Sequence, residues 1–294
     1  MELEGCEALR EAVGGCELVL LTATRAEAEP LLSALGGTEP HTACTKELFV
    51  GRLALGKSAS TGAATAGWVR AIVAISGCDK ANTAHVLTLL LQAMEPKPLL
   101  VLQLGVAGAL PHREGGAGAD VGDLILATEE IYSDTGSLSP EGWLSAEELG
   151  LPLARVNGRD TGGRFVLDPR LVQAAVTAVE GAPWAGPRPQ VVTGPCVTAS
   201  RVTGLSAEAE ELVARWGAVA ESMEGAAAAH ICCLYDVPFL EVRGISNLVV
   251  DRDRASWEVA RAASVAAWAT LAVAAAFDRL PLSGEGTLRG AGGM

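Results

Sequence analysis

Short apolar segments with the character of strands alternate along this chain with segments that have the apolar spacing of helices. The strand candidates are Glu17–Thr22, Leu48–Leu55, Trp68–Ser76, Pro98–Gln103, Val121–Ile131 and Pro238–Ile245, with extended segments at Gln190–Pro195 and Gly217–Glu221. The helix candidates are Arg25–Leu32, Asp79–Met94, Pro169–Val179, Ala207–Arg215, Met223–Leu234 and Ser256–Leu280. Runs such as Pro98–Gln103 lack a polar face, which is typical of strands covered on both sides. This alternation predicts a three-layer α/β/α sandwich with a mixed central sheet.

The chain has 294 residues, 49% of them apolar, which is enough to build one large core. No Pro-, Ser- or Gly-rich linker divides the apolar content into two parts, so we expect a single domain over residues 1–282. The Gly-rich residues 283–294 are expected to form a disordered tail. The segment Tyr132–Asp168 is rich in Gly, Ser and Pro and is expected to form long loops with short local structure.

Charge and cysteine content restrict the partners and the compartment. The formal net charge is -13 and no Lys/Arg cluster occurs, so neither nucleic acid nor an anionic membrane is expected as a partner. The apolar runs are far shorter than the ~20 residues that span a bilayer. The N-terminus is acidic and the seven cysteines contain no C-x-x-C pair, which favours a cytoplasmic protein. The four histidines are scattered without metal-ligand spacing, so no metal or cofactor is expected.

One segment formally matches the phosphate-binding loop of nucleotide triphosphatases. Gly51–Ser58 (GRLALGKS) fits the pattern G-x-x-x-x-G-K-[ST]. That pattern requires a compact loop followed by a helix, whereas the residues between the two glycines alternate like a strand. The segment is therefore predicted to be a strand that ends in a turn.

Three polar segments follow apolar strands, where α/β folds bind their ligands. Gly105–Gly108 (GVAG) allows close approach of the backbone to a ligand, although Gly is common in α/β turns. Glu221–Gly225 (ESMEG) places a carboxylate at a helix start, where it either caps the helix or binds a sugar diol. Arg243–Asn247 (RGISN) is expected to be a turn, whose Asn offers a donor and an acceptor to a heterocycle or is an ordinary turn residue.

In combination and order, these segments resemble the purine nucleoside phosphorylase/hydrolase superfamily, on the branch of the methylthioadenosine/S-adenosylhomocysteine nucleosidases. The resemblance extends from Glu17 to Leu280. Within the superfamily, the futalosine hydrolases are the most similar, because of Ala23–Leu32 (ATRAEAEPLL), Arg243–Asn247, Asp251–Asp253 and Trp257. The resemblance implies the nucleoside phosphorylase/hydrolase fold, in which the central mixed sheet is partly barrel-like.

The resemblance also implies roles for individual residues. A Glu in the first strand–helix loop of the family positions and deprotonates the attacking water, which matches Glu27, with Glu29 as the near rival. Met223 is expected to pack on the sugar and Glu224 to bind its hydroxyl groups.

Other positions depart from the nucleosidase pattern. Val106 and Gly108 belong to the segment expected near the ribose and the water, but the nucleosidases carry a small hydroxyl residue at the position of Val106. Val197 stands where those enzymes place an aromatic ring over the purine, so an apolar wall is expected there instead of a stacking ring.

Asn247 is the position that distinguishes between purine bases. Adenine-specific nucleosidases of the superfamily carry Asp there, and a protonated carboxyl group can donate to N7 and accept from the 6-amino group. An Asn amide donates but cannot transfer a proton, which favours a 6-oxopurine such as hypoxanthine. A mismatched pair would leave a buried polar group unsatisfied, at a cost of about 1–3 kcal/mol.

The expected reaction is hydrolysis of futalosine to hypoxanthine and dehypoxanthine futalosine, a step of menaquinone biosynthesis, without metal or cofactor. A 6-oxopurine nucleoside phosphorylase stays open, because Arg25 lies in the same loop as Glu27 and could bind phosphate. So do a methylthioadenosine-type nucleosidase and a non-catalytic nucleoside-binding module. The family resemblance implies a homo-oligomer, and Phe165 is a candidate for the 5′ side of the sugar pocket.

Overall fold

The computed structural model describes residues 2–56, 67–112, 118–156, 159–282 and 288–290 of the chain. Its main sheet contains parallel and antiparallel strand pairs in the order β15-β11-β6-β12-β13-β5-β1-β4-β3-β2, and β14 pairs with both β5 and β6. The strands of this sheet are β1 (Leu18–Thr22), β2 (Gly36–Ala43), β3 (Lys46–Ala54), β4 (Trp68–Ile75), β5 (Leu100–Ala109), β6 (Leu124–Tyr132), β11 (Arg164–Leu167), β12 (Val191–Thr198), β13 (Ala220–Ser222), β14 (Phe239–Leu248) and β15 (Leu288–Gly290).

Five strands of the sheet form a closed ring. β6 pairs with β12, β12 with β13, β13 with β5, β5 with β14, and β14 again with β6. Each strand of a closed ring has a neighbour on both sides, so the ring itself has no free edge. The mixed, partly barrel-like sheet that the resemblance implied is confirmed.

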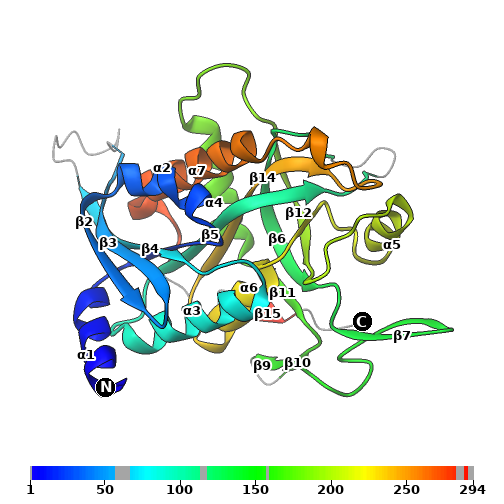
Figure 1. Ribbon diagram of the computed structural model, residues 1–294, viewed down its shortest axis with the longest axis horizontal. Coiled ribbons are helices and arrows are strands. Elements are labelled where there is room, and N and C mark those ends of the chain that lie inside the picture. Colours follow the sequence, from blue (N-terminus) through cyan, green and yellow to red (C-terminus); the bar gives the residue numbers. More distant parts are fainter. Residues whose placement is uncertain (1, 57–66, 113–117, 157–158, 283–287, 291–294) are drawn as a thin grey trace.

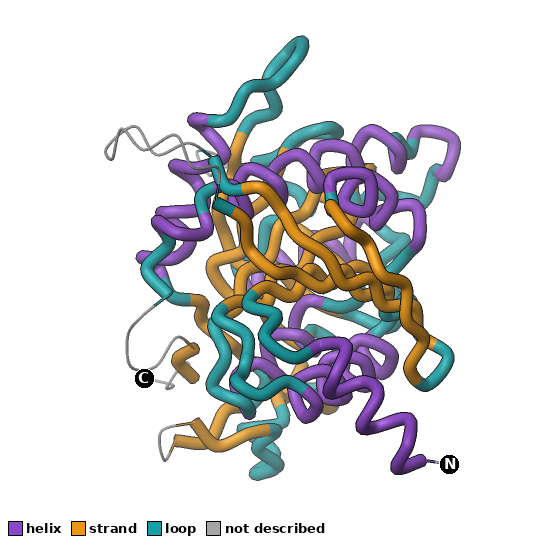
Figure 2. Tube along the Cα trace, turned by 90° about the vertical axis from the view of Figure 1, so that its left-hand side faces the viewer, coloured by secondary structure: helices purple, strands orange, loops and turns teal. Residues whose placement is uncertain are grey.

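Helices cover both faces of the sheet. They are α1 (Glu2–Val13), α2 (Arg25–Ala34), α3 (Lys80–Ala93), α4 (Pro169–Gly181), α5 (Ser206–Trp216), α6 (Gly225–Leu234) and α7 (Val259–Ala275). Helix α7 packs on β14 and β5 and contacts α2 and α4, whereas α3 packs on α6 and α1. The two groups lie on opposite sides of the strands (Figure 1), and Figure 2 shows the strands as the layer between them. The predicted three-layer α/β/α architecture is confirmed.

Several boundaries differ from those predicted. The Gly105–Gly108 and Arg243–Asn247 segments are not loops, because they lie inside β5 and β14, which continue beyond their apolar parts to complete the ring. The long C-terminal helix begins only at Val259, after a 3-10 turn at Arg254–Ser256, and a second 3-10 turn covers Phe277–Arg279.

Other elements were not expected from the sequence. Helix α1 is one, and the polar strand β2 at the sheet edge is another. The expected loops of Tyr132–Asp168 contain the short strands β7 (Gly136–Ser139), β8 (Gly142–Ser145), β9 (Ala154–Val156), β10 (Arg159–Thr161) and β11, of which β7 pairs with β8 and β9 with β10. Within the expected disordered tail, Leu288–Gly290 forms β15 on β11, and residues 283–287 and 291–294 lie outside the described residues.

The phosphate-loop match falls partly in a strand. Gly51–Ala54 belongs to β3, which is paired on both sides by β2 and β4. Lys57 and Ser58 lie outside the described residues. The residues between the two glycines of the motif therefore form a ladder instead of a phosphate-binding loop. No helix in the described ranges is both long and apolar enough to cross a membrane.

Candidate active site

A cavity of about 240 Å³ collects most of the polar residues predicted from the sequence. Its wall contains Ala23, Thr24, Glu27, Cys78, Val106, Ala107, Gly108, Val202, Thr203, Glu221, Ser222, Met223, Glu224, Ser246, Asn247, Val249, Arg252 and Trp257. Three larger hollows exist, one between α4 and α7, one over β2–β4 and one bounded by Glu17, Trp68 and Phe277. Among the described residues, none of the three is lined by a buried carboxylate, so the smaller cavity is the candidate active site.

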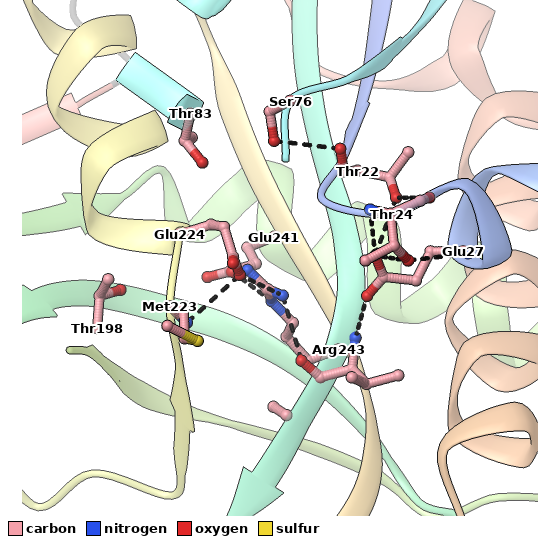
Figure 3. A network of polar contacts seen from close by, with 12 residues as sticks. Thr22, Thr24, Glu27, Ser76, Thr83, Thr198, Met223, Glu224, Glu241 and Arg243 are labelled. Atoms are coloured by element: carbon pink, nitrogen blue, oxygen red, sulfur yellow. Dashed lines mark hydrogen bonds and ion pairs between the residues drawn. The ribbon is translucent and has the colours of Figure 1, made fainter. Parts of the chain in front are cut away.

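Glu27 reaches the cavity from the first turn of α2 and is 5% exposed. It forms a capping box with Thr24, in which each side chain accepts a hydrogen bond from the backbone N–H of the other residue. Its Oε2 accepts hydrogen bonds from Thr24 N (2.8 Å), Thr24 Oγ1 (2.8 Å) and Thr22 Oγ1 (3.1 Å). These donors fix one carboxylate oxygen and leave the other, Oε1, on the side of β5 (Figure 3).

The middle of β5 is built to receive Glu27. The backbone N–H of Val106 donates to Glu27 Oε1 at 3.0 Å. A Cβ on Gly105 would lie 2.8 Å from Glu27 Oε1 and 2.6 Å from Arg243 Nη1, so a side chain at this position would displace both groups. Gly105 is therefore needed for the close approach of these charged side chains to the strand, as expected for a glycine at a ligand site.

Glu224 stands at the N-cap position of α6 but does not cap the helix through its side chain. The cap is Thr198, whose Oγ1 accepts a hydrogen bond from Ala226 N at 2.8 Å. The carboxylate of Glu224 instead accepts from Asp79 N (3.1 Å) and from Arg243 Nη1 (3.2 Å). Burial raises the pKa of Glu224, and the charge of Arg243 opposes this shift. The carboxylate is thus held at the cavity wall beside Met223 instead of serving the helix.

Arg243 lies on β14 at the centre of these acids and is fully buried. Its Nε donates to Glu241 Oε1 at 2.6 Å, and its Nη1 donates to Glu224 Oε2 and to Val106 O, both at 3.2 Å. Burial alone lowers the pKa of Arg243, but the charges of Glu241, Glu224 and Glu27 together raise it, so the guanidinium stays charged. The positive charge sits between two of the carboxylates that line the cavity, those of Glu27 and Glu224 (Figure 3).

Asn247 lines a part of the cavity made by three neighbouring strands. Gly108 on β5 pairs with Glu221 on β13 and with Asn247 on β14, so these residues form one row across the sheet. Asn247 Oδ1 accepts from Ser246 Oγ at 2.7 Å, and Nδ2 donates to Leu248 O at 3.2 Å. Glu221 accepts from the N–H and the hydroxyl of Thr203, both at 2.8 Å, and its burial raises its pKa.

Some predicted residues do not line the cavity. Val197 is fully buried in a separate apolar cluster with Ile131, Leu212 and Val249, so the expected wall over the base is not formed by its side chain. Phe165 is also fully buried and stacks on His230, with ring centroids 5.1 Å apart, away from the cavity.

Arg25 and Glu29 also lie away from the cavity. Their side chains are 52% and 64% exposed, and Arg25 Nε donates to Glu29 Oε2 at 3.3 Å. Arg25 Nη1 makes a second ion pair with Glu47. Of the two glutamates that were rivals, Glu27 is therefore the one that reaches the cavity.

The structure adds residues that sequence reasoning missed. Arg243 and Glu241 are two positions apart in an otherwise apolar strand, so they share a face, and this pairing was the signal for a buried ion pair. Thr24-Arg25-Ala26-Glu27 has the spacing of a capping box, which identifies Glu27 as the first-turn acid. Arg252 stacks over the Trp257 ring at 4.9 Å, and both line the cavity. No cluster of three or more potential metal ligands occurs within the described ranges.

Comparisons with known proteins identify the family of the chain. A family model described as "Phosphorylase superfamily" matches residues 17–280. The chain is 30% identical over 242 residues to the futalosine hydrolase of Acidothermus cellulolyticus, covering 82% of this chain and 83% of that protein. It is 26% identical over 205 residues to the 5'-methylthioadenosine/S-adenosylhomocysteine nucleosidase of Mycobacterium tuberculosis, covering 65% and 76%.

A solved structure has a similar fold. The futalosine hydrolase of Helicobacter pylori superimposes with a TM-score of 0.69 at 20% identity, covering 90% of this chain and 99% of that one. The family match covers nearly the whole sheet and every described wall residue of the cavity. This chain belongs to the phosphorylase superfamily.

Proposed function

We propose that this chain is a nucleosidase that hydrolyses the N-glycosidic bond of a 6-oxopurine nucleoside, and that its substrate is futalosine. The observation that carries the proposal is the pairing of Glu27 and Asn247 in one cavity. The wall of this cavity holds both a carboxylate, which can accept a proton, and an amide, which can pair with a purine. The similarity to a futalosine hydrolase over 82% of the chain supports the choice of substrate.

The mechanism follows from the polarity of the cavity. Water attacks C1′ of the sugar, and Glu27 accepts its proton through Oε1, the oxygen that faces Val106 and Arg243. The C1′–N bond breaks, and its electron pair leaves with the purine, which takes up a proton, so that water is divided between sugar and base. Glu224 accepts hydrogen bonds from the sugar hydroxyl groups, and Asn247 donates one to the departing base.

Water is favoured over phosphate as the nucleophile by the charges of the cavity. Three buried glutamates, Glu27, Glu221 and Glu224, line it. The buried cation, Arg243, already donates to two carboxylates and a carbonyl. A phosphate dianion here would face more negative than positive charge, whereas a neutral water would not.

The proposal is tested by incubating the protein with futalosine, inosine and methylthioadenosine in phosphate-free buffer and measuring the free base. We expect hypoxanthine to be released from futalosine at a higher kcat/KM than base from the other two. Absence of hypoxanthine would overturn the proposal. A strict requirement for phosphate would identify a phosphorylase, and preferential release of adenine would identify a methylthioadenosine-type nucleosidase, the alternative that the nucleosidase relatives support.

Substitution of Asn247 tests whether this side chain reads the base. We expect Asn247→Asp to shift the ratio of kcat/KM values from 6-oxo toward 6-amino nucleosides by about 10- to 100-fold, the effect of one mismatched buried polar pair. The shift should be larger at lower pH, because the carboxyl group must be protonated to donate to N7. Competition assays with inosine and adenosine analogues measure the ratio.

A suitable control for this substitution is Asn82→Asp. Asn82 lies on α3 and accepts a hydrogen bond from Lys46, and it is not part of the cavity wall. If Asn247→Asp and Asn82→Asp give the same base preference, Asn247 does not read the base.

A further inference from the structure

Two buried carboxyl groups lie behind the cavity wall and have no part in the cleavage described above. Glu130 on β6 and Glu241 on β14 are both fully buried. Their Oε2 atoms meet beneath the N-terminus of α6, where a Cβ on Gly225 would overlap both. That Cβ position lies 2.4 Å from each of the two Oε2 atoms, so the two carboxyl groups are close neighbours. Two ionised carboxylates are both acceptors, so this contact requires a proton on one of them.

The surrounding charges also require a proton. Glu241 and Glu224 bond to Arg243, Glu27 lies next to it, and Glu130 adds a fourth carboxyl group around this single guanidinium. The other titratable groups that face the pair are Cys196 on β12 and Tyr132 on β6. Neither carries a positive charge. Four ionised carboxylates around one cation would leave a large uncompensated charge in a low-dielectric interior.

The hydrogen bonds show which member of the pair is ionised. Glu241 Oε1 accepts from Arg243 Nε at 2.6 Å, the shortest contact of the guanidinium, so Glu241 is the anion. Among the residues that the structure describes, Glu130 forms no ion pair, and its Oε2 accepts from the hydroxyl of Thr198 at 2.9 Å. Within the described part of the chain, Glu130 Oε1 and Glu241 Oε2 find no donor. A proton carried by Glu130 would give Glu241 Oε2 the hydrogen bond that it lacks.

We propose that Glu130 and Glu241 hold one proton between them and act together as positioning residues for Arg243. Protonated Glu130 fixes ionised Glu241, which in turn orients the guanidinium between Glu27 and Glu224. The inference rests on the proposed function, in which Glu27 faces the water and Glu224 faces the sugar. Burial, followed by the charge of Glu241, raises the pKa of Glu130 well above its ordinary value, in agreement with a retained proton.

The proton is detected through the pH dependence of folding. Above about pH 4.5 the unfolded chain releases the proton of Glu130, whereas the folded chain keeps it, so stability falls as pH rises. Gln at this position cannot ionise. As pH rises above about 4.5 we therefore expect the folding equilibrium constant of the wild type to fall relative to that of Glu130→Gln, by up to about tenfold per pH unit. Equal pH dependence of the two proteins would overturn the inference.

The neighbouring residue offers a matched control. Glu129 also lies on β6 but points to Arg164, with which it forms two hydrogen bonds of 2.7 Å at the edge of the fold. Glu129→Gln should keep the pH slope of the wild type. If Glu129→Gln and Glu130→Gln changed the slope equally, the effect would not belong to the buried pair, and the inference would fail.

Turnover tests the positioning role. Glu130→Gln keeps a donor toward Glu241, whereas Glu130→Leu does not. We therefore expect the kcat of Glu130→Gln to be about tenfold higher than that of Glu130→Leu. Glu241→Gln removes the anion that orients Arg243 and should lower kcat by about 100-fold with little change in KM. Equal kcat for Glu130→Gln and Glu130→Leu, or an unchanged kcat in Glu241→Gln, would exclude the role.

The two proposals fail in different ways. If the wild type cleaves no nucleoside, the proposed function is wrong, and the pH dependence of folding still shows whether the proton is shared. If the wild type cleaves futalosine but Glu130→Gln and the wild type have parallel pH dependence, the function stands and the shared proton does not exist.

Discussion

Glu27→Gln should lower kcat for futalosine hydrolysis by about a thousandfold and leave binding of the nucleoside largely intact. The size of the effect is that of removing a general base. Gln has nearly the shape of Glu and keeps an oxygen that can accept, but it cannot take a proton from water. Steady-state kinetics measure the loss of turnover, and calorimetric titration with futalosine measures the binding that the variant retains.

Glu29→Gln is the matched control, because Glu29 lies two residues further along α2 and is 64% exposed. It changes the same functional group outside the cavity and should leave kcat unaltered. A Glu27→Gln variant that retains wild-type turnover would show that water is activated elsewhere. A variant that loses binding and turnover together would show that Glu27 holds the substrate or the fold, and folding of the variant is checked by thermal unfolding.

The architecture was predictable because it depends on the spacing of apolar residues along each strand and helix. Runs such as Pro98–Gln103 lack a polar face, and only a sheet covered on both sides buries them. Helix α3 was predicted because Asp79–Met94 has clear apolar spacing, and in the structure Asp79 caps the helix by accepting from Lys80 N. Strand β2 was not predictable in this way, since an edge strand is largely exposed and its sequence GGTEPHTA has no apolar face.

The strand ends were misjudged for a physical reason. In an open sheet, small and polar residues after an apolar run indicate a loop. In this ring, β5 and β14 continue through Gly105–Gly108 and Arg243–Asn247, because each strand still has partners beyond the apolar core. The polar ends of these two strands therefore stay paired within the sheet, and side chains from them face the cavity instead of the solvent. Closure of a sheet depends on contacts between distant segments, which single runs of sequence do not contain.

The sequence predicted those residues of the candidate site that directly follow a strand or directly precede a helix. Glu27 follows β1 at the start of a helix, and Glu224 precedes α6, so both reach the same edge of the sheet. Val197 was assigned to the cavity only by resemblance, and its neighbours in the fold bury it elsewhere. Arg243 was missed because an arginine in an apolar strand has meaning only with its partners, and Glu27 and Glu224 come from distant parts of the chain.

Arg243→Met should be the most destabilising single substitution in the site, with a loss of about 3–5 kcal/mol at neutral pH. Met approximates the length of the side chain but removes the charge and every donor. Glu241 and Glu224 then remain buried without a cation, and the Val106 carbonyl loses a donor. Chemical denaturation measures the free energy of unfolding, and turnover should be lost in parallel, because Glu27 and Glu224 no longer have a positive charge between them to offset their mutual repulsion.

The pH dependence separates this electrostatic effect from a packing defect. Burial raises the pKa of Glu224 and the charge of Arg243 opposes this shift. Without Arg243 the folded variant therefore holds the proton of Glu224 more tightly than the unfolded chain does, and its stability falls as pH rises above about 4.5. The difference from the wild type should therefore shrink at about pH 5 and grow toward about pH 8, whereas a packing defect would give a constant difference. Arg164→Met is the control, since Arg164 is partly exposed and its ion pair with Glu129 lies outside the cavity. It should cost less than Arg243→Met, because it leaves one carboxylate without its cation instead of two. An Arg243→Met variant with a small, pH-independent loss would mean that the acids around Arg243 are already neutral in the wild type, and that the guanidinium does not organise the site by its charge.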